Sequence, residues 1–156
     1  MVTNSPLKEV LGKAIQREID SQRLYTDLEN KVREESAKYA FKELVEQERE
    51  HQTILEQYLR GELKKGALGR GHVVDFKIAE RLNHPEISLD MTLKDIFLLA
   101  ANREKLSNEF YIGLAEIHPA GEIKRLLKKL AAQELQHKQR VERLYTEVAF
   151  PQLDGG

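Results

Sequence analysis

The chain repeats itself at a distance of 86 residues, and the repeat preserves polar residues as well as apolar ones. In the first part of each half, the aligned residues are Arg17, Glu18, Ser21 and Tyr25 with Arg103, Glu104, Ser107 and Tyr111. In the second part, without a gap, they are Gln47, Glu48 and His51 with Gln133, Glu134 and His137. Both halves therefore read RExxSxxxY and then QExxH, so any fold must give the two halves equivalent structural roles.

Each repeated segment has the hydrophobic spacing of an amphipathic helix, with steps of three and four, and no segment alternates as a strand would. Ser5 before Pro6 is a plausible N-cap for the first helix, and Thr92 with Asp95 resembles a capping box at the start of the third. Short turns then predict two antiparallel helical hairpins. The predicted helices cover about residues 5–31, 35–60, 92–117 and 122–148.

A longer segment, residues 61–91, joins the two halves, and several glycines interrupt its helical pattern, although residues 75–82 have some helical spacing. A connection of this length allows the second and third helices to run parallel. The sequence therefore predicts an all-α fold, a four-helix bundle of two antiparallel hairpins with one long crossover. The length of 156 residues fits a single domain, residues 1–156, with a short C-terminal tail.

The composition excludes several classes of site and partner. The chain has 25 basic and 26 acidic residues, and a net charge of −1 predicts no attraction to nucleic acid or to an anionic membrane. There is no cysteine, which excludes disulfides, thiolate zinc sites and iron–sulfur clusters, so any metal has oxygen and nitrogen ligands. No apolar run is long enough to span a bilayer and no signal core is present, so a cytoplasmic protein is expected.

The repeated glutamates and histidines occupy positions that the periodicity predicts to be buried. Each helix has one mostly apolar face whose middle is polar, so all four polar groups should meet at one level. In chain order, the core positions are Leu7, Leu11, Ala14, Glu18, Ser21, Tyr25 and Leu28; Ala37, Phe41, Leu44, Glu48, His51, Leu55 and Tyr58; Leu93, Phe97, Ala100, Glu104, Ser107, Tyr111 and Leu114; and Ile123, Leu127, Leu130, Glu134, His137, Val141 and Leu144.

Four glutamates in an apolar interior would repel one another, and the core positions supply no lysine or arginine to neutralise them. Two divalent cations would balance the four charges and leave both histidines neutral and able to coordinate. The Glu and His of each ExxH are three residues apart, hence neighbours on one helix face. The predicted two-metal site consists of Glu18, Glu48, His51, Glu104, Glu134 and His137.

This ligand set favours iron or manganese over a structural zinc site, because it is rich in oxygen and has one imidazole per metal. Iron is preferred on functional grounds, with manganese or mixed metals as alternatives. The competing interpretation of the same residues is a buried polar network without metal. No catalytic residue is predicted beyond the metal ligands.

Several other residues have an ordinary interpretation beside a functional one. Tyr25 and Tyr111 lie two turns beyond Glu18 and Glu104, where their phenols can hydrogen-bond ligand carboxylates, but core tyrosines have the same spacing. Adjacent helical residues point about 100° apart, so the arginines beside those glutamates are expected in surface ion pairs. Surface positions are also expected for His72, His84 and His118 and for the basic cluster Lys124, Arg125, Lys128 and Lys129.

With the pattern Glu, ExxH, Glu, ExxH over four helices, residues 5–148 resemble the ferritin-like superfamily, most closely the rubrerythrin-type di-iron domains. The resemblance implies a reaction with hydrogen peroxide or dioxygen, an external electron donor such as a rubredoxin-like protein, and a homodimer. It implies that one iron is bound by Glu18 and His51, that the other is bound by Glu104 and His137, and that the bridges are Glu48 and Glu134.

Two departures from this family keep other functions open. Rubrerythrins usually carry a further carboxylate one turn after the third-helix glutamate, where this chain has Ser107, and a cysteine-rich rubredoxin domain, which this chain lacks. The first alternative is an iron-binding or ferroxidase-type iron-handling protein. Cage storage is not expected, because few residues follow the fourth helix. Hydroxylation of an organic substrate and manganese catalase chemistry are further alternatives.

Overall fold

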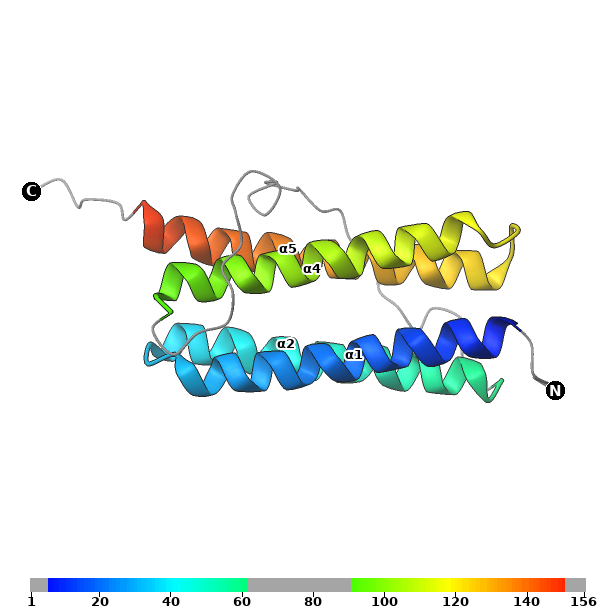
Figure 1. Cartoon of the computed structure of the whole chain (residues 1–156), viewed down its shortest axis with the longest axis horizontal. Coiled ribbons are helices and arrows are strands. Elements are labelled where there is room, and N and C mark those ends of the chain that lie inside the picture. Colours follow the sequence, from blue (N-terminus) through cyan, green and yellow to red (C-terminus); the bar gives the residue numbers. More distant parts are fainter. Residues whose placement is uncertain (1–5, 62–90, 151–156) are drawn as a thin grey trace, which may run out of the picture. The chain divides into compact units, whose positions relative to one another are not determined.

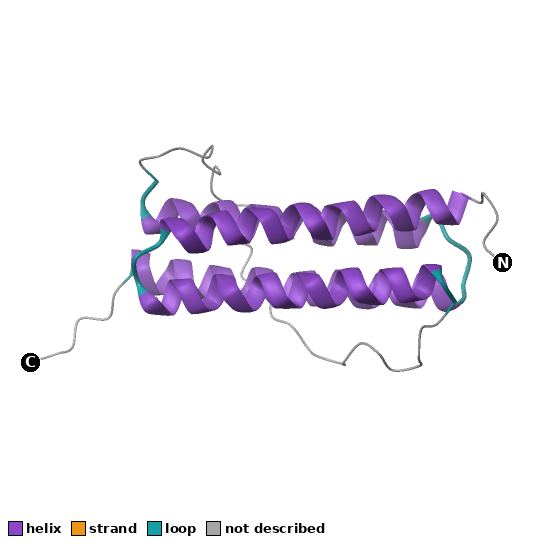
Figure 2. Ribbon diagram, turned by 90° about the horizontal axis from the view of Figure 1, so that it is seen from below, coloured by secondary structure: helices purple, strands orange, loops and turns teal. Residues whose placement is uncertain are grey.

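A computed structural model of the protein describes residues 6–61 and 91–150, except for the side chains of residues 6 and 7. Within these ranges the chain forms helices and turns only (Figures 1 and 2). All four predicted helices are confirmed, as α1 (Pro6–Lys31), α2 (Glu35–Leu59), α4 (Leu93–Glu116) and α5 (Glu122–Ala149). None of the described helices has an apolar stretch sufficient to cross a membrane.

Some sequence predictions concern residues outside those described. These are the Ser5 cap, the core position of Leu7, residues 62–90 of the crossover, His72 and His84 within it, and the tail from residue 151. The described residues belong to two compact units, Met1–Arg70 and Gly71–Gly156. Each unit contains one antiparallel helical hairpin, α1 with α2 and α4 with α5, joined by a short turn (Figure 1).

Local interactions set where the helices of each hairpin begin and end. The Thr92 hydroxyl accepts a hydrogen bond from the Asp95 backbone N–H at 3.2 Å, and the Asp95 carboxylate accepts one from the Thr92 N–H at 3.3 Å. This is the predicted capping box, and it fixes the start of α4 at Leu93, eleven residues before Glu104. At the end of α2, Gly61 has a φ of 75°, a left-handed conformation that glycine adopts without side-chain strain.

The buried faces of the helices agree with the predicted core positions in their central turns. The central residues of all four faces are almost completely buried, including every glutamate and histidine of the repeat. Of the outermost predicted positions, Leu28 and Ala37 are buried, and five are only half-buried, namely Tyr58, Leu93, Leu114, Ile123 and Leu144. At these five positions the helix has neighbours on fewer sides, so the periodicity of the sequence overestimates burial there.

Phe41 on α2 is the clearest test of this core, because its ring is fully buried and stacks on Tyr25 of α1 with 6.1 Å between centroids. We expect Phe41→Ala to lower the free energy of unfolding of the metal-free protein by about 3–5 kcal/mol, through lost apolar burial and the resulting cavity. Urea unfolding monitored by circular dichroism measures this change in the free energy of unfolding. The control is Tyr39→Ala on the same helix, whose side chain is 62% exposed and should change stability little. A loss below about 1 kcal/mol for Phe41→Ala would contradict the packing described.

Candidate metal centre

The first hairpin brings together one glutamate of α1 and the ExxH pair of α2. Glu18, Glu48 and His51 are each at most 2% exposed. The Nδ1 atom of His51 lies 3.6 Å from a carboxylate oxygen of Glu18 and 3.8 Å from one of Glu48. One donor atom from each residue lies within 4.8 Å of the other two. We call these three residues the first half-site.

The second hairpin repeats this arrangement with the aligned residues. Glu104 of α4 and Glu134 of α5 are at most 1% exposed, and His137 of α5 is 6% exposed. The Nδ1 atom of His137 lies 3.6 Å from a carboxylate oxygen of Glu104 and 3.9 Å from one of Glu134. One donor atom from each of these three residues lies within 4.8 Å of the other two, and we call them the second half-site. The internal repeat of the sequence is therefore a repeat of geometry.

The distances within each half-site suit ligands of a common cation. The imidazole-to-carboxylate separations of 3.6–3.9 Å exceed an N–H···O hydrogen bond. Donor atoms bound about 2.1 Å from one metal ion lie at most about 4.2 Å apart, and all four separations satisfy this limit. In both half-sites Nδ1 faces the carboxylates, so ligation through it leaves the proton of the neutral ring on Nε2.

The charges of each half-site also suit a divalent cation. Two buried carboxylates in one apolar hairpin carry two negative charges, and leaving such charges uncompensated is costly. One divalent ion offsets both and accepts the neutral imidazole as a further ligand. Each hairpin therefore contains a buried Glu/His cluster that can bind metal, and the donor set fits iron or manganese.

Lys138 is a buried cation that the periodicity of the sequence did not predict, because it lies beside His137 rather than on the predicted core face. Its side chain is 1% exposed, and its Nζ atom lies 3.3 Å and 3.2 Å from the two carboxylate oxygens of fully buried Glu142. The positive charge of this lysine is thus offset by a carboxylate that does not belong to the second half-site. The signal in the sequence was the departure from the repeat, since the residue aligned with Lys138 is Gln52.

The residues flanking the half-sites are placed partly as expected. Tyr25 and Tyr111 are fully buried, and their hydrogen bonds to ligand carboxylates stay a prediction. Ser21 and Ser107 are also buried, at 2% and 3% exposure. Arg17, Arg103 and His118, all predicted to lie at the surface, are half-buried instead. A contact with the helix explains the half-buried position of His118, because its Nδ1 lies 2.6 Å from the backbone oxygen of Leu114 one turn earlier.

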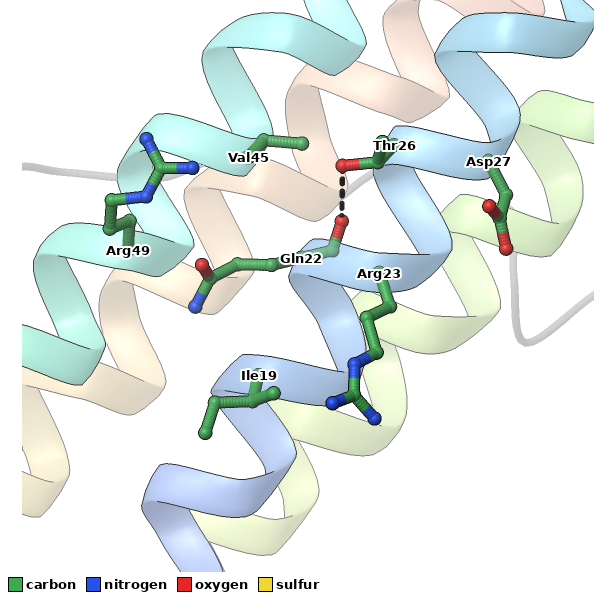
Figure 3. A pocket seen from close by; sticks show the side chains of 7 residues that line it. All are labelled: Ile19, Gln22, Arg23, Thr26, Asp27, Val45 and Arg49. Atoms are coloured by element: carbon green, nitrogen blue, oxygen red, sulfur yellow. Dashed lines mark hydrogen bonds between the residues drawn. The ribbon is translucent and has the colours of Figure 1, made fainter.

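A surface groove on the first hairpin lies elsewhere and contains none of the six predicted ligands (Figure 3). Within it the Thr26 hydroxyl donates a 2.8 Å hydrogen bond to the backbone oxygen of Gln22. The groove is lined by Ile19, Gln22, Arg23, Thr26, Asp27, Val45 and Arg49. We assign it no part in metal binding.

Comparison with known proteins places the chain in a family. The sequence profile of the rubrerythrin family matches residues 9–145, which is most of the chain. A solved structure, a hypothetical protein from Pyrococcus furiosus, is similar with a TM-score of 0.65 and 26% identity, over 94% of this chain and 92% of that one. No curated protein matches significantly. The fold class is the predicted all-α, ferritin-like four-helix bundle, and the chain belongs to the rubrerythrin family of ferritin-like di-iron proteins.

Proposed function

We propose that this protein is a non-haem di-iron oxidoreductase that reduces hydrogen peroxide or dioxygen with electrons from an external donor. The observation that carries the proposal is the pair of matching Glu, Glu, His half-sites, each buried and each spaced for one cation. Membership of the rubrerythrin family supports iron as the metal and peroxide as the oxidant.

The proposed ligand roles follow the repeat. Each metal would be held by a terminal glutamate and a histidine, and the glutamates of the two ExxH pairs would be shared by both metals as bridges. The terminal pairs are Glu18 with His51 and Glu104 with His137, and the bridges are Glu48 and Glu134. The support for this assignment is the chemistry of the donor atoms, their burial and the family pattern.

The side chains in and around the half-sites compensate charge and exclude water, as redox chemistry at a buried metal requires. When bound, a pair of iron ions supplies two electrons to hydrogen peroxide, which takes up two protons and yields two water molecules, and the external donor restores the electrons. The glutamates hold the positive charge in a buried site, and the apolar residues above and below them exclude water. Ser21 and Ser107 are small buried residues one turn beyond the glutamates of α1 and α4.

The test begins with metal content and proceeds to turnover. We expect protein loaded anaerobically with Fe²⁺ to hold about two irons per chain and to oxidise reduced rubredoxin when peroxide is added. The expected stoichiometry is two electrons per peroxide. His51→Ala should remove this turnover, whereas Thr53→Ala, an exposed change on the same helix, should leave it intact. Stable binding of two irons without peroxide-dependent oxidation of the donor would reject the oxidoreductase and leave the metal centre standing.

An iron-handling protein of the ferroxidase type is the second candidate. The observation that favours it is the equality of the two ligand sets, with buried Ser107 where rubrerythrins usually have an additional carboxylate. Aerobic addition of Fe²⁺ in excess, without any other reductant, separates the two functions. An iron-handling protein would oxidise many more than two irons per chain, while a peroxide reductase would stop when its own centre is oxidised.

A further inference from the structure

The two hairpins differ at the positions beside their half-sites. In the first hairpin, Gln22 of α1 donates a 2.7 Å hydrogen bond to the side chain of Gln52 on α2. Gln52 in turn donates one of 2.9 Å to the carboxylate of Glu56, one turn along α2. Gln52 follows the ligand His51 directly, and these hydrogen bonds end on the half-buried carboxylate of Glu56, five residues after His51.

In the second hairpin the aligned residues make different contacts. Asn108 replaces the first glutamine and donates a 2.7 Å hydrogen bond to the backbone oxygen of Ala131. Lys138 replaces the second and forms the buried ion pair with Glu142 described above. Gln52 and Glu56 therefore carry a summed charge of −1 in the first hairpin. The aligned Lys138 and Glu142 carry a summed charge of zero in the second.

Other aligned half-buried residues also make the second hairpin more positive than the first. Ile19, beside the ligand of α1, aligns with Lys105, and Glu43 of α2 aligns with Lys129 of α5. Helix α2 has six acidic and three basic residues, whereas α5 has four acidic and seven basic ones. Salt screens the exposed charges among these, so the buried and half-buried ones dominate at the metal positions.

We infer that the two half-sites bind cations unequally, with the first hairpin holding its metal more tightly because Glu56 gives it a negative charge that, at the aligned Glu142 of the second hairpin, is cancelled by Lys138. The inference rests on the proposed two-metal centre. A half-site with one fewer neighbouring negative charge attracts a divalent cation less, and at partly buried positions one unit of charge amounts to about a tenfold difference in affinity. The second half-site therefore fills last and exchanges its metal first.

The experiment is a titration of the metal-free full-length protein with Co²⁺, monitored by isothermal titration calorimetry. We expect two binding steps whose dissociation constants differ about tenfold. Mutual repulsion between the two cations also separates the steps, so variants of the first hairpin carry the test. Gln52→Lys gives that hairpin the lysine of the second, and Glu56→Gln removes its negative charge. Each should weaken the tighter step about tenfold and bring the two steps together.

The matched control is the double variant Lys138→Gln with Glu142→Gln, which removes the buried pair but keeps the charge sum at zero. Both steps should stay within about threefold of their original values. A tighter step unchanged by Gln52→Lys and Glu56→Gln, or a double variant that shifts the steps more strongly, overturns the inference while the two-metal centre stands. A wild-type chain that binds fewer than two Co²⁺ ions overturns the proposed centre, and this inference with it.

Discussion

Replacing Glu48 and Glu134 together with alanine is expected to reduce the metal content from about two ions per chain to nearly none. Both side chains are fully buried, and each supplies a carboxylate to its half-site. As proposed bridges they serve both metals, so the double change removes ligands and negative charge from each metal at once. Mass spectrometry of metals on protein loaded anaerobically with Fe²⁺ measures the loss.

Single variants make this prediction sharper. If Glu48 bridges, Glu48→Ala alone should weaken binding of both metals, whereas a glutamate confined to the first half-site would affect only one. The control is Glu46→Ala, an exposed residue on α2 whose 2.6 Å ion pair with Arg49 lies outside the ligand set. Its metal content should equal that of the wild type. Two metals retained per chain by the double alanine variant would refute the assigned ligands.

Metal loading is expected to raise the free energy of unfolding by about 4 kcal/mol per site when free metal is a thousand times the dissociation constant. The physical reason is that the folded hairpins arrange the ligands and the unfolded chain does not. Urea unfolding of protein with chelator and with Mn²⁺, under otherwise equal conditions, measures the increment. An increment near zero at saturating metal would contradict a site assembled by folding.

The sign of a conservative change distinguishes the metal site from an ordinary polar network. Glu48→Gln with Glu134→Gln removes two buried charges, so we expect the metal-free protein to become more stable and the metal-dependent increment to disappear. Glu142→Gln is the matched control, since Glu142 is equally buried but pairs with Lys138. Breaking that pair should destabilise the protein with or without metal, by about 3–5 kcal/mol. Destabilisation by the first pair of changes would favour the polar network.

The sequence predicted the local structure well because helices are determined largely by neighbouring residues. The steps of three and four located all four helices, and Thr92 with Asp95 identified the capping box at the start of α4. The same periodicity put the glutamates and histidines on buried faces, where the structure has them. Matching polar residues at an offset of 86 then made metal ligation more plausible than an accidental cluster.

Tertiary structure decided how far burial extends around and along each helix. Periodicity identifies the centre of a buried face but not its width, so Lys138 and Glu142, just beside that centre, were not predicted to be buried. It also cannot show that the ends of a hairpin are less covered, as at Tyr58 and Leu144. The orientation of each imidazole likewise depends on side-chain packing across the hairpin.

The sequence by itself thus determined the helices, the repeat and the six candidate ligands of this protein, because these depend on spacing along one chain. Only the tertiary structure decided that the Nδ1 atoms of both histidines face carboxylates at 3.6–3.9 Å and that the Lys138–Glu142 ion pair, next to His137 in the sequence, is buried. Those features depend on distances between side chains of different turns and helices, which spacing along the chain does not specify.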